Sequence, residues 1–237
     1  MPVAEVVSAP SVSSTPSPRP LAIQPVAPSG SQVVQFAPYG FNATTGRGNR
    51  AHPTQERVSR WVRQVRAGQH QEHGIPTLYL QHGVNAGGTR GCLRPILEYL
   101  FETPGLRVLI GRREFIDLRR SVMNTVFDIL DARLILKKDE QLHIYTIRTV
   151  GVPAELHFQH LGDPDSLGSQ QFAAILVVEA SEITEPVFRA LQRRARQEAH
   201  PSFILLEGNP PPTGSWLDAL TDPNADLYDP SITKIEL

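Results

Sequence analysis

Short apolar runs alternate with segments of helical spacing between residues 77 and 210. Four runs have the apolar content of strands buried on both faces: TLYLQHG (77–83), LRVLIG (106–111), FAAILVVEA (172–180) and SFILLEGNP (202–210). Between them, apolar residues recur on one helical face in RPILEYLFE (94–102), REFIDLRRSVMNTVFDIL (113–130) and PVFRALQRRARQEA (186–199). This alternation predicts an α/β fold, with a mainly parallel sheet and helices on both faces.

Two further segments complete the predicted domain. LHIYTIR (142–148) and AELHFQHL (154–161) alternate in polarity, which is typical of a hairpin or of edge strands. In HPTQERVSRWVRQVRAG (52–68), the apolar residues have helical spacing, and six arginines lie between residues 47 and 66. A solvated helix face is the ordinary explanation of these arginines, and a phosphate-contacting patch is the alternative.

The ends of the chain differ from this core in composition. Residues 1–50 are rich in Pro, Ser, Ala and Val, so we predict a disordered tail or linker, with a partner-binding tail as the alternative. We predict the folded domain over 51–222 and a polar C-terminal tail over 223–237. The net charge is −1, so any contact with nucleic acid must come from local basic patches. Cys92 is the only cysteine, which excludes an intramolecular disulfide and suits a reducing cytosol. We find no secretory signal and no run that could span a membrane.

A glycine-rich turn follows the first predicted strand. Phosphate-binding loops need a strand, a glycine turn and a helix N-terminus, together with a Lys for the phosphates and a Ser or Thr hydroxyl for Mg²⁺. Aligned on such a loop, the segment has Leu93 at the lysine position and Arg94 at the hydroxyl position; it comprises Gly87, Gly88, Thr89, Arg90, Gly91, Cys92, Leu93 and Arg94. A ligand-free turn remains the alternative.

Two polar residues end later apolar strands. Glu179 follows the run Ile175–Val178, at the edge where open α/β sheets bind ligands, and Val178 stands where a second acid would organise Mg²⁺. Asn209 follows the next strand, where an amide could sense a γ-phosphate. Taken singly, Glu179 is equally a solvated strand end, and Asn209 part of an ordinary Asn-Pro turn.

Together these segments resemble the ATPase domain of phage terminase large subunits, over residues 50–220. The resemblance is strongest in GDPDSLGSQQFAAILVVEASEI (162–183) and in GNPPPTGSW (208–216). It implies a P-loop NTPase-like fold and a motor that uses ATP and Mg²⁺ to move double-stranded DNA into a procapsid. Its partners would be a portal protein, a small terminase subunit and further copies in a ring, with no membrane partner, in the host cell cytoplasm.

The resemblance also implies roles for individual residues. Glu179 would be the catalytic carboxylate, Asn209 the coupling residue, Arg90 a phosphate-binding arginine, and Gln55 the glutamine on the adenine side. Residues 87–94 would be the phosphate loop, and no residue is assigned to a metal. The site requires that the turn near Thr89 and Glu179 end neighbouring strands and face one crevice.

The sequence departs from the terminase pattern at three points. Leu93 removes the phosphate-binding ammonium, Val178 removes one acid, and the chain ends at Leu237 without the usual nuclease domain. These departures favour a second hypothesis, in which a catalytically impaired terminase-like protein acts as an interaction or regulatory module.

Overall fold

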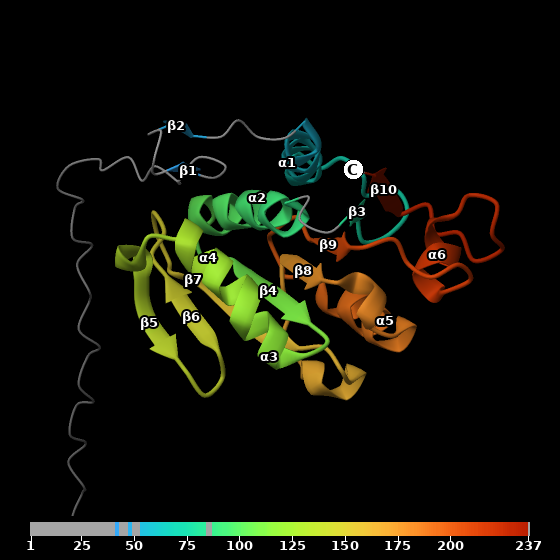
Figure 1. Cartoon of the computed structure of the whole chain (residues 1–237). Coiled ribbons are helices and arrows are strands. Elements are labelled where there is room, and N and C mark those ends of the chain that lie inside the picture. Colours follow the sequence, from blue (N-terminus) through green and yellow to red (C-terminus); the bar gives the residue numbers. More distant parts are fainter. Residues whose placement is uncertain (1–40, 43–46, 49–52, 84–86, 237) are drawn as a thin grey trace, which may run out of the picture. The chain divides into compact units, whose positions relative to one another are not determined.

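An eight-stranded sheet forms the centre of the computed structural model, which describes residues 41–42, 47–48, 53–83 and 87–236 (Figure 1). The strand order is β10-β3-β9-β8-β4-β7-β6-β5. The strands are β3 (Thr77–Gln81), β4 (Arg107–Arg112), β5 (Ile135–Asp139), β6 (Ile144–Ile147), β7 (Ala154–His160), β8 (Ala174–Val178), β9 (Phe203–Gly208) and β10 (Ile232–Glu236). A separate two-stranded pair joins β1 (Phe41–Asn42) to β2 (Arg47–Gly48). The predicted tail over 1–50 lies almost entirely outside the described residues.

The sheet is mainly parallel, as the sequence predicted. Every pair from β10 to β7 is parallel, whereas β6 runs antiparallel to β7 and β5 antiparallel to β6. The predicted hairpin is therefore confirmed as β6 and β7. The sequence did not predict β5, in which Lys137 and Lys138 are exposed on the edge of the sheet, a position where charge discourages pairing with other chains.

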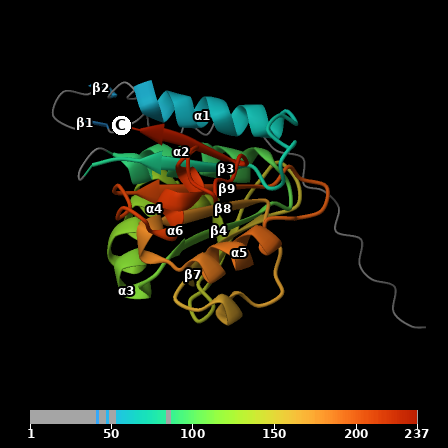
Figure 2. The same cartoon turned by 90° about the vertical axis from the view of Figure 1, so that its right-hand side faces the viewer.

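Helices cover both faces of the sheet. They are α1 (Pro53–Arg66), α2 (Gly88–Glu102), α3 (Phe115–Asp117), α4 (Asn124–Ile129), α5 (Glu185–Arg194) and α6 (Trp216–Thr221), with short 3₁₀ turns at Ala132–Leu134, Pro164–Leu167 and Ala180–Glu182. Helices α1 and α2 lie together, and α2 packs on β9 and β8. The opposite face packs against α5 and α6 through a core that includes Val177, Phe188 and Leu206 (Figure 2). No helix in the described ranges is long and apolar enough to cross a bilayer.

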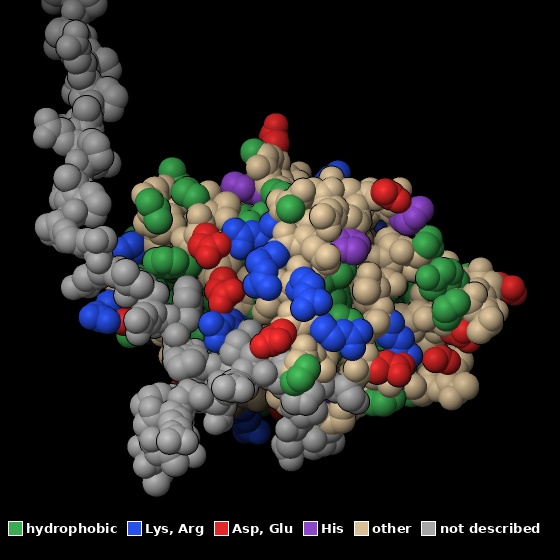
Figure 3. All heavy atoms as spheres, turned by 90° about the horizontal axis from the view of Figure 1, so that it is seen from above, with side chains coloured by type: hydrophobic (Ala, Val, Ile, Leu, Met, Phe, Trp, Pro, Cys, Tyr) green, Lys and Arg blue, Asp and Glu red, His purple; other side chains and the backbone are tan. Residues whose placement is uncertain are grey.

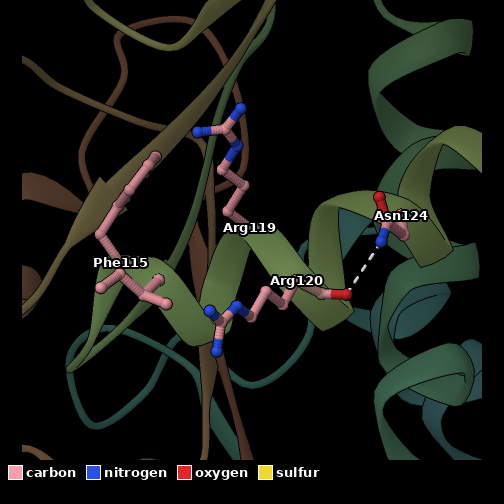
Figure 4. Close-up of a pocket in the computed structure, with 5 residues that line it drawn as sticks. Phe115, Arg119, Arg120 and Asn124 are labelled. Carbon is pink, nitrogen blue, oxygen red and sulfur yellow. Dashed lines mark hydrogen bonds between the residues drawn. The ribbon is translucent and has the colours of Figure 1, made fainter.

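The predicted long helix over 113–130 contains a π-helical segment. Leu118–Met123, labelled η1, lies between α3 and α4 and has this wider winding. Ser121, Asn124 and Thr125 each donate a side-chain hydrogen bond to a carbonyl four residues earlier. Figure 4 shows the bond from Asn124 to the Arg120 carbonyl. Such bonds compete with the backbone ladder, which explains a local change of winding that apolar spacing alone cannot predict.

The C-terminal tail predicted over 223–237 contains a strand of the main sheet, so this prediction was wrong. Residues 232–236 form β10, which pairs in parallel with β3. Ile232 and Ile235 are both buried although they are three residues apart, because the two faces of the sheet are both covered at this edge. The short segment therefore lacks the alternation that identifies a strand in sequence.

Candidate functional site

The phosphate-loop candidate lies between the end of β3 and the start of α2. Gly87 has a left-handed backbone (φ 75°) and precedes the first residue of α2. The Gln55 side chain of α1 packs on this helix start, because its Nε2 donates to the Gly87 carbonyl at 3.2 Å. A Cβ added at Gly91 would lie 2.9 Å from Gln55 Cγ, so Gly91 allows α1 to approach α2 closely. Gln55, which the resemblance assigned to the adenine side, thus contacts the loop itself.

The structure corrects the alignment of this loop. Cys92 and Leu93 are fully buried in the second turn of α2, and burial raises the pKa of the Cys92 thiol. Arg94 donates to Glu98 at 2.7 Å along the same helix. These three residues therefore belong to α2 and do not line a loop, so our alignment placed the end of the loop too late in the chain. The alignment included Gly91 in the loop, whereas Gly91 lies within α2 and accommodates the Gln55 side chain.

Thr89 lies in the first turn of α2 and contacts a buried acid that the sequence analysis missed. Its hydroxyl donates to Glu207 Oε1 at 2.9 Å, and the other Glu207 oxygen binds His82 Nε2. Glu207 is fully buried at the end of β9. The signal was present in the sequence, since an acid in the apolar run SFILLEGNP is the same feature that identified Glu179.

His82 is oriented by contacts at both ring nitrogens. Its Nε2 lies against the Glu207 carboxyl group, and its Nδ1 lies 2.9 Å from the Gly83 carbonyl oxygen. The hydrogen bond to Glu207 raises the His82 pKa, against a smaller lowering by burial. The ring fills the space beside Gly88, where an added Cβ would lie 2.0 Å from His82 Cδ2.

A second contact forms beside this network, after β8. Glu179 follows β8 with a left-handed backbone (φ 54°), which is strained for a residue with a side chain. Asn209 Nδ2 donates to Glu179 Oε2 at 3.4 Å, and the Tyr79 hydroxyl donates to the Asn209 carbonyl at 2.8 Å. Burial and then the charge of Glu179 raise the Tyr79 pKa, so this hydroxyl stays a donor. An added Cβ at Gly208 would lie 3.2 Å from Glu179 Cα, so any larger residue there would press on the backbone at Glu179.

The turn after β9 joins these two contacts. We expected the glycine turn and Glu179 to end neighbouring strands, but β9 lies between β3 and β8. Glu207 reaches the β3–α2 side through Thr89, and Asn209 reaches the β8 side through Glu179. The predicted residues are therefore brought to one edge of the sheet, with residues 207–209 bridging them. This carboxyl edge, where β3, β9 and β8 end, is our candidate site.

Two arginines near this edge differ in their contacts. Arg90 is partly exposed in the first turn of α2 and has no ion-pair partner within the described ranges. Arg112, at the end of β4, makes a two-point contact with Glu182 at 2.9 and 3.1 Å, which raises the Arg112 pKa. Where the chain is described, no group of three or more His, Cys, Asp or Glu side chains could hold a metal ion. A surface hollow of 460 Å³ beside Phe115 and Arg119 contains none of the site residues (Figure 4).

The fold and this edge define a class of protein. A strand, a glycine turn and a helix N-terminus lie beside an acid-ended parallel strand, at the edge where open α/β sheets hold their ligands. No family model and no curated protein matches the sequence.

Solved structures specify the fold further. It is that of the ATPase domain of phage large terminases. The large terminase of a thermophilic bacteriophage, in complex with ADP, superposes with a TM-score of 0.65 at 15% identity, over 79% of this chain and 45% of that one. The ATPase domain of a Thermus phage large terminase gives 0.51 at 14% identity, over 80% and 81%. The HK97 bacteriophage large terminase gives 0.54 at 13% identity, over 74% and 36%. The chain spans less than half of the length of the first and the third of these structures.

Proposed function

We propose that this chain is the ATPase motor domain of a viral DNA-packaging terminase, which couples ATP hydrolysis to movement of double-stranded DNA into a procapsid. The fold supports this proposal, and the Glu179–Asn209 contact beside the glycine-rich start of α2 carries it. It places a carboxylate and an amide at the edge where such sheets bind nucleotides. A related large terminase was solved with ADP and another crystal of it with ATP-gamma-S, which supports nucleotide as the ligand.

Each residue has a role in this proposal. The N-terminus of α2, from Gly88, offers backbone N–H groups and a positive dipole end to phosphate oxygens. Arg90, unpaired within the described ranges, adds a guanidinium on that turn. Glu179 orients the attacking water, and Asn209 reports on the state of Glu179 because the two side chains touch. Gln55 keeps the start of α2 in place.

The partners follow from the same proposal. A packaging motor acts on double-stranded DNA at a portal, together with a small terminase subunit, as a ring of copies in the host cytoplasm. We propose residues 51–222, extended by β10, as the motor domain.

One observation favours a second candidate function, a terminase-like module that binds partners without hydrolysing ATP. In the corrected alignment Gly88 and Thr89 stand where a phosphate loop carries Lys and Ser or Thr. Thr89 supplies the hydroxyl, but Gly88 supplies no ammonium, and the His82 ring fills the space beside it. Loss of that cation removes transition-state stabilisation, which would slow hydrolysis more than binding.

Measurement of Mg²⁺-dependent ATP turnover separates the two candidates. We expect Glu179→Gln to lower turnover by roughly 10²–10³-fold, since the catalytic carboxylate is lost while its shape is kept. The matched control is Glu140→Gln, an exposed acid in the turn between β5 and β6. Nucleotide binding without turnover above the Glu179→Gln level would favour the module. Absence of binding would reject any role for nucleotide in this chain.

A further inference from the structure

Glu207 is a fully buried carboxylate to which the roles above give no task. We propose that Glu207 acts from β9 as the second acid of the nucleotide site and is the positioning residue that aims the Thr89 hydroxyl at a nucleotide-bound Mg²⁺. This inference rests on the proposed function, because the Mg²⁺ would arrive with the nucleotide.

The hydrogen bond between Thr89 and Glu207 has a defined direction. The carboxylate can only accept, so the hydroxyl proton points at Glu207 Oε1 over the 2.9 Å contact. The oxygen lone pairs of Thr89 therefore point away from Glu207, in directions from which a cation can approach. In P-loop enzymes an acid and a Ser or Thr hydroxyl together hold Mg²⁺. Oxygen donors of this kind fit that ion.

The register of the sheet explains why the acid comes from β9. Position 178 is where the sequence pattern requires the second acid, and it holds a valine. Val178 on β8 pairs directly with Glu207 on β9. Paired residues of parallel strands share a face, and here that face is the one covered by α2, which carries Thr89. The acid is thus displaced by one strand and remains on the α2 side.

His82 makes a buried carboxylate tolerable at this place. Its imidazole pairs with the second Glu207 oxygen, so Glu207 is not an uncompensated buried charge. Both Glu207 oxygens already accept a hydrogen bond, one from Thr89 and one at His82, and we therefore describe Glu207 as a positioning residue and not as a metal ligand. The described residues contain no cluster of three metal-binding side chains, so phosphate oxygens and water would supply the other ligands of the ion. Mg²⁺ should then bind tightly only together with nucleotide.

The test is the effect of Mg²⁺ on nucleotide affinity, measured with a fluorescent ADP analogue and the full chain, in Mg²⁺ or in EDTA. For the wild-type protein we expect Mg²⁺ to strengthen binding by about tenfold, the effect of one well-placed ligand contact of about 1.4 kcal/mol. Glu207→Gln and Thr89→Val should each reduce this gain to less than about threefold, so the ratio of the affinities in Mg²⁺ and in EDTA is the readout for each variant. Glu140→Gln and Thr146→Val are the matched controls and should keep the gain.

A relocated acid gives the complementary test. Val178→Asp combined with Glu207→Gln returns a carboxylate to β8, and we expect it to restore the Mg²⁺ gain. If Glu207→Gln fails to fold by circular dichroism, Thr89→Val decides alone, because it removes only the hydroxyl. A full Mg²⁺ gain in either folded single variant overturns the role of Glu207. A wild-type chain that binds no nucleotide in Mg²⁺ or EDTA overturns the proposed function itself, which is a different result.

Discussion

The carboxyl edge of the sheet and the outer face of α1 hold charged side chains in opposite ways. At the edge, Glu207 is buried and both of its oxygens are bonded. On α1, Arg57, Arg60 and Arg63 are exposed at every third position and have no partner within the described ranges. Figure 3 shows Lys and Arg side chains following one another across the face that carries α1.

The difference concerns what each charge contributes. A buried ion pair such as His82–Glu207 gains little over an apolar core, but removal of one partner is expensive because the other stays buried and charged. An exposed arginine is surrounded by water and salt, so its removal changes the fold little. We therefore expect the buried charges of the carboxyl edge to affect the stability of the fold. The exposed arginines of α1 affect it little and can instead contact a binding partner.

The largest expected effect is that of Gly88→Ala. The added Cβ would lie 2.0 Å from the His82 ring, so the ring must leave Glu207 or the start of α2 must shift. We expect a loss of about 2–4 kcal/mol in the free energy of unfolding, because a buried carboxylate loses a charged partner. A gain of up to about 1 kcal/mol in helix propensity offsets part of it.

Urea denaturation monitored by circular dichroism measures this loss. The matched control is Gly83→Ala, since a Cβ at Gly83 meets nothing within 4 Å. If the two variants have the same free energy of unfolding, the His82–Glu207 pair does not contribute to stability.

An intermediate effect is expected from pH. Glu207 raises the His82 pKa in the folded state above the ordinary value of 6.5. The stability that the pair contributes is then complete below pH 6.5 and is lost as the pH rises through the raised pKa. The free energy of unfolding should fall over that window in the wild type, and the slope should be smaller in His82→Gln.

A second histidine provides an internal comparison for the pH experiment. Burial lowers the His157 pKa, against a smaller raising effect of Glu155. His157 should therefore have the opposite effect of pH to His82. Because its pKa is lower in the folded state, the free energy of unfolding decreases as the pH falls from 6.5 towards the folded pKa of His157. A slope above pH 6.5 that persists unchanged in His82→Gln would refute the assignment of that slope to the pair.

The sequence predicted much of this edge, and the reasons for its failures are physical. Glu179 and Asn209 were found because a polar residue after an apolar strand is a local signal. Glu207 has the same local signal and was overlooked, while its contact with Thr89, 118 positions away in the chain, is a feature that only the fold reveals. Gly91 has no side chain because α1 packs closely against α2 at this position. No local sequence pattern distinguishes such a helix-packing glycine from a loop glycine.

The fold class was more accessible than the details of its elements. Central strands such as β8 and β9 are continuous apolar runs, because both of their faces are covered. The edge strands β5 and β10 have polar or irregular patterns, because pairing with a neighbour defines them more than burial does. Strand order is likewise set by long-range pairing, so the insertion of β9 between β3 and β8 could not be read from the sequence.

The smallest expected effect on stability is that of replacing Arg57, Arg60 and Arg63 together by Gln. We expect a change within about 0.5 kcal/mol in the free energy of unfolding, because the three side chains are exposed and unpaired within the described ranges. Arg66 on the same helix is the contrasting case. It contacts Glu102 at 2.8 Å and lies 4.6 Å from the centre of the Tyr99 ring, so Arg66→Gln should cost about 1 kcal/mol.

If the triple variant folds, it can be used to test whether the α1 arginines contact DNA. Double-stranded DNA binding is measured against salt concentration for the wild type and the variant. If the α1 face contacts phosphates, the salt dependence should weaken by about 0.9 in log–log slope for each lost contact, up to roughly 3 in total. An unchanged slope identifies the α1 arginines as a solvated face and moves the search for a DNA contact to another part of the chain.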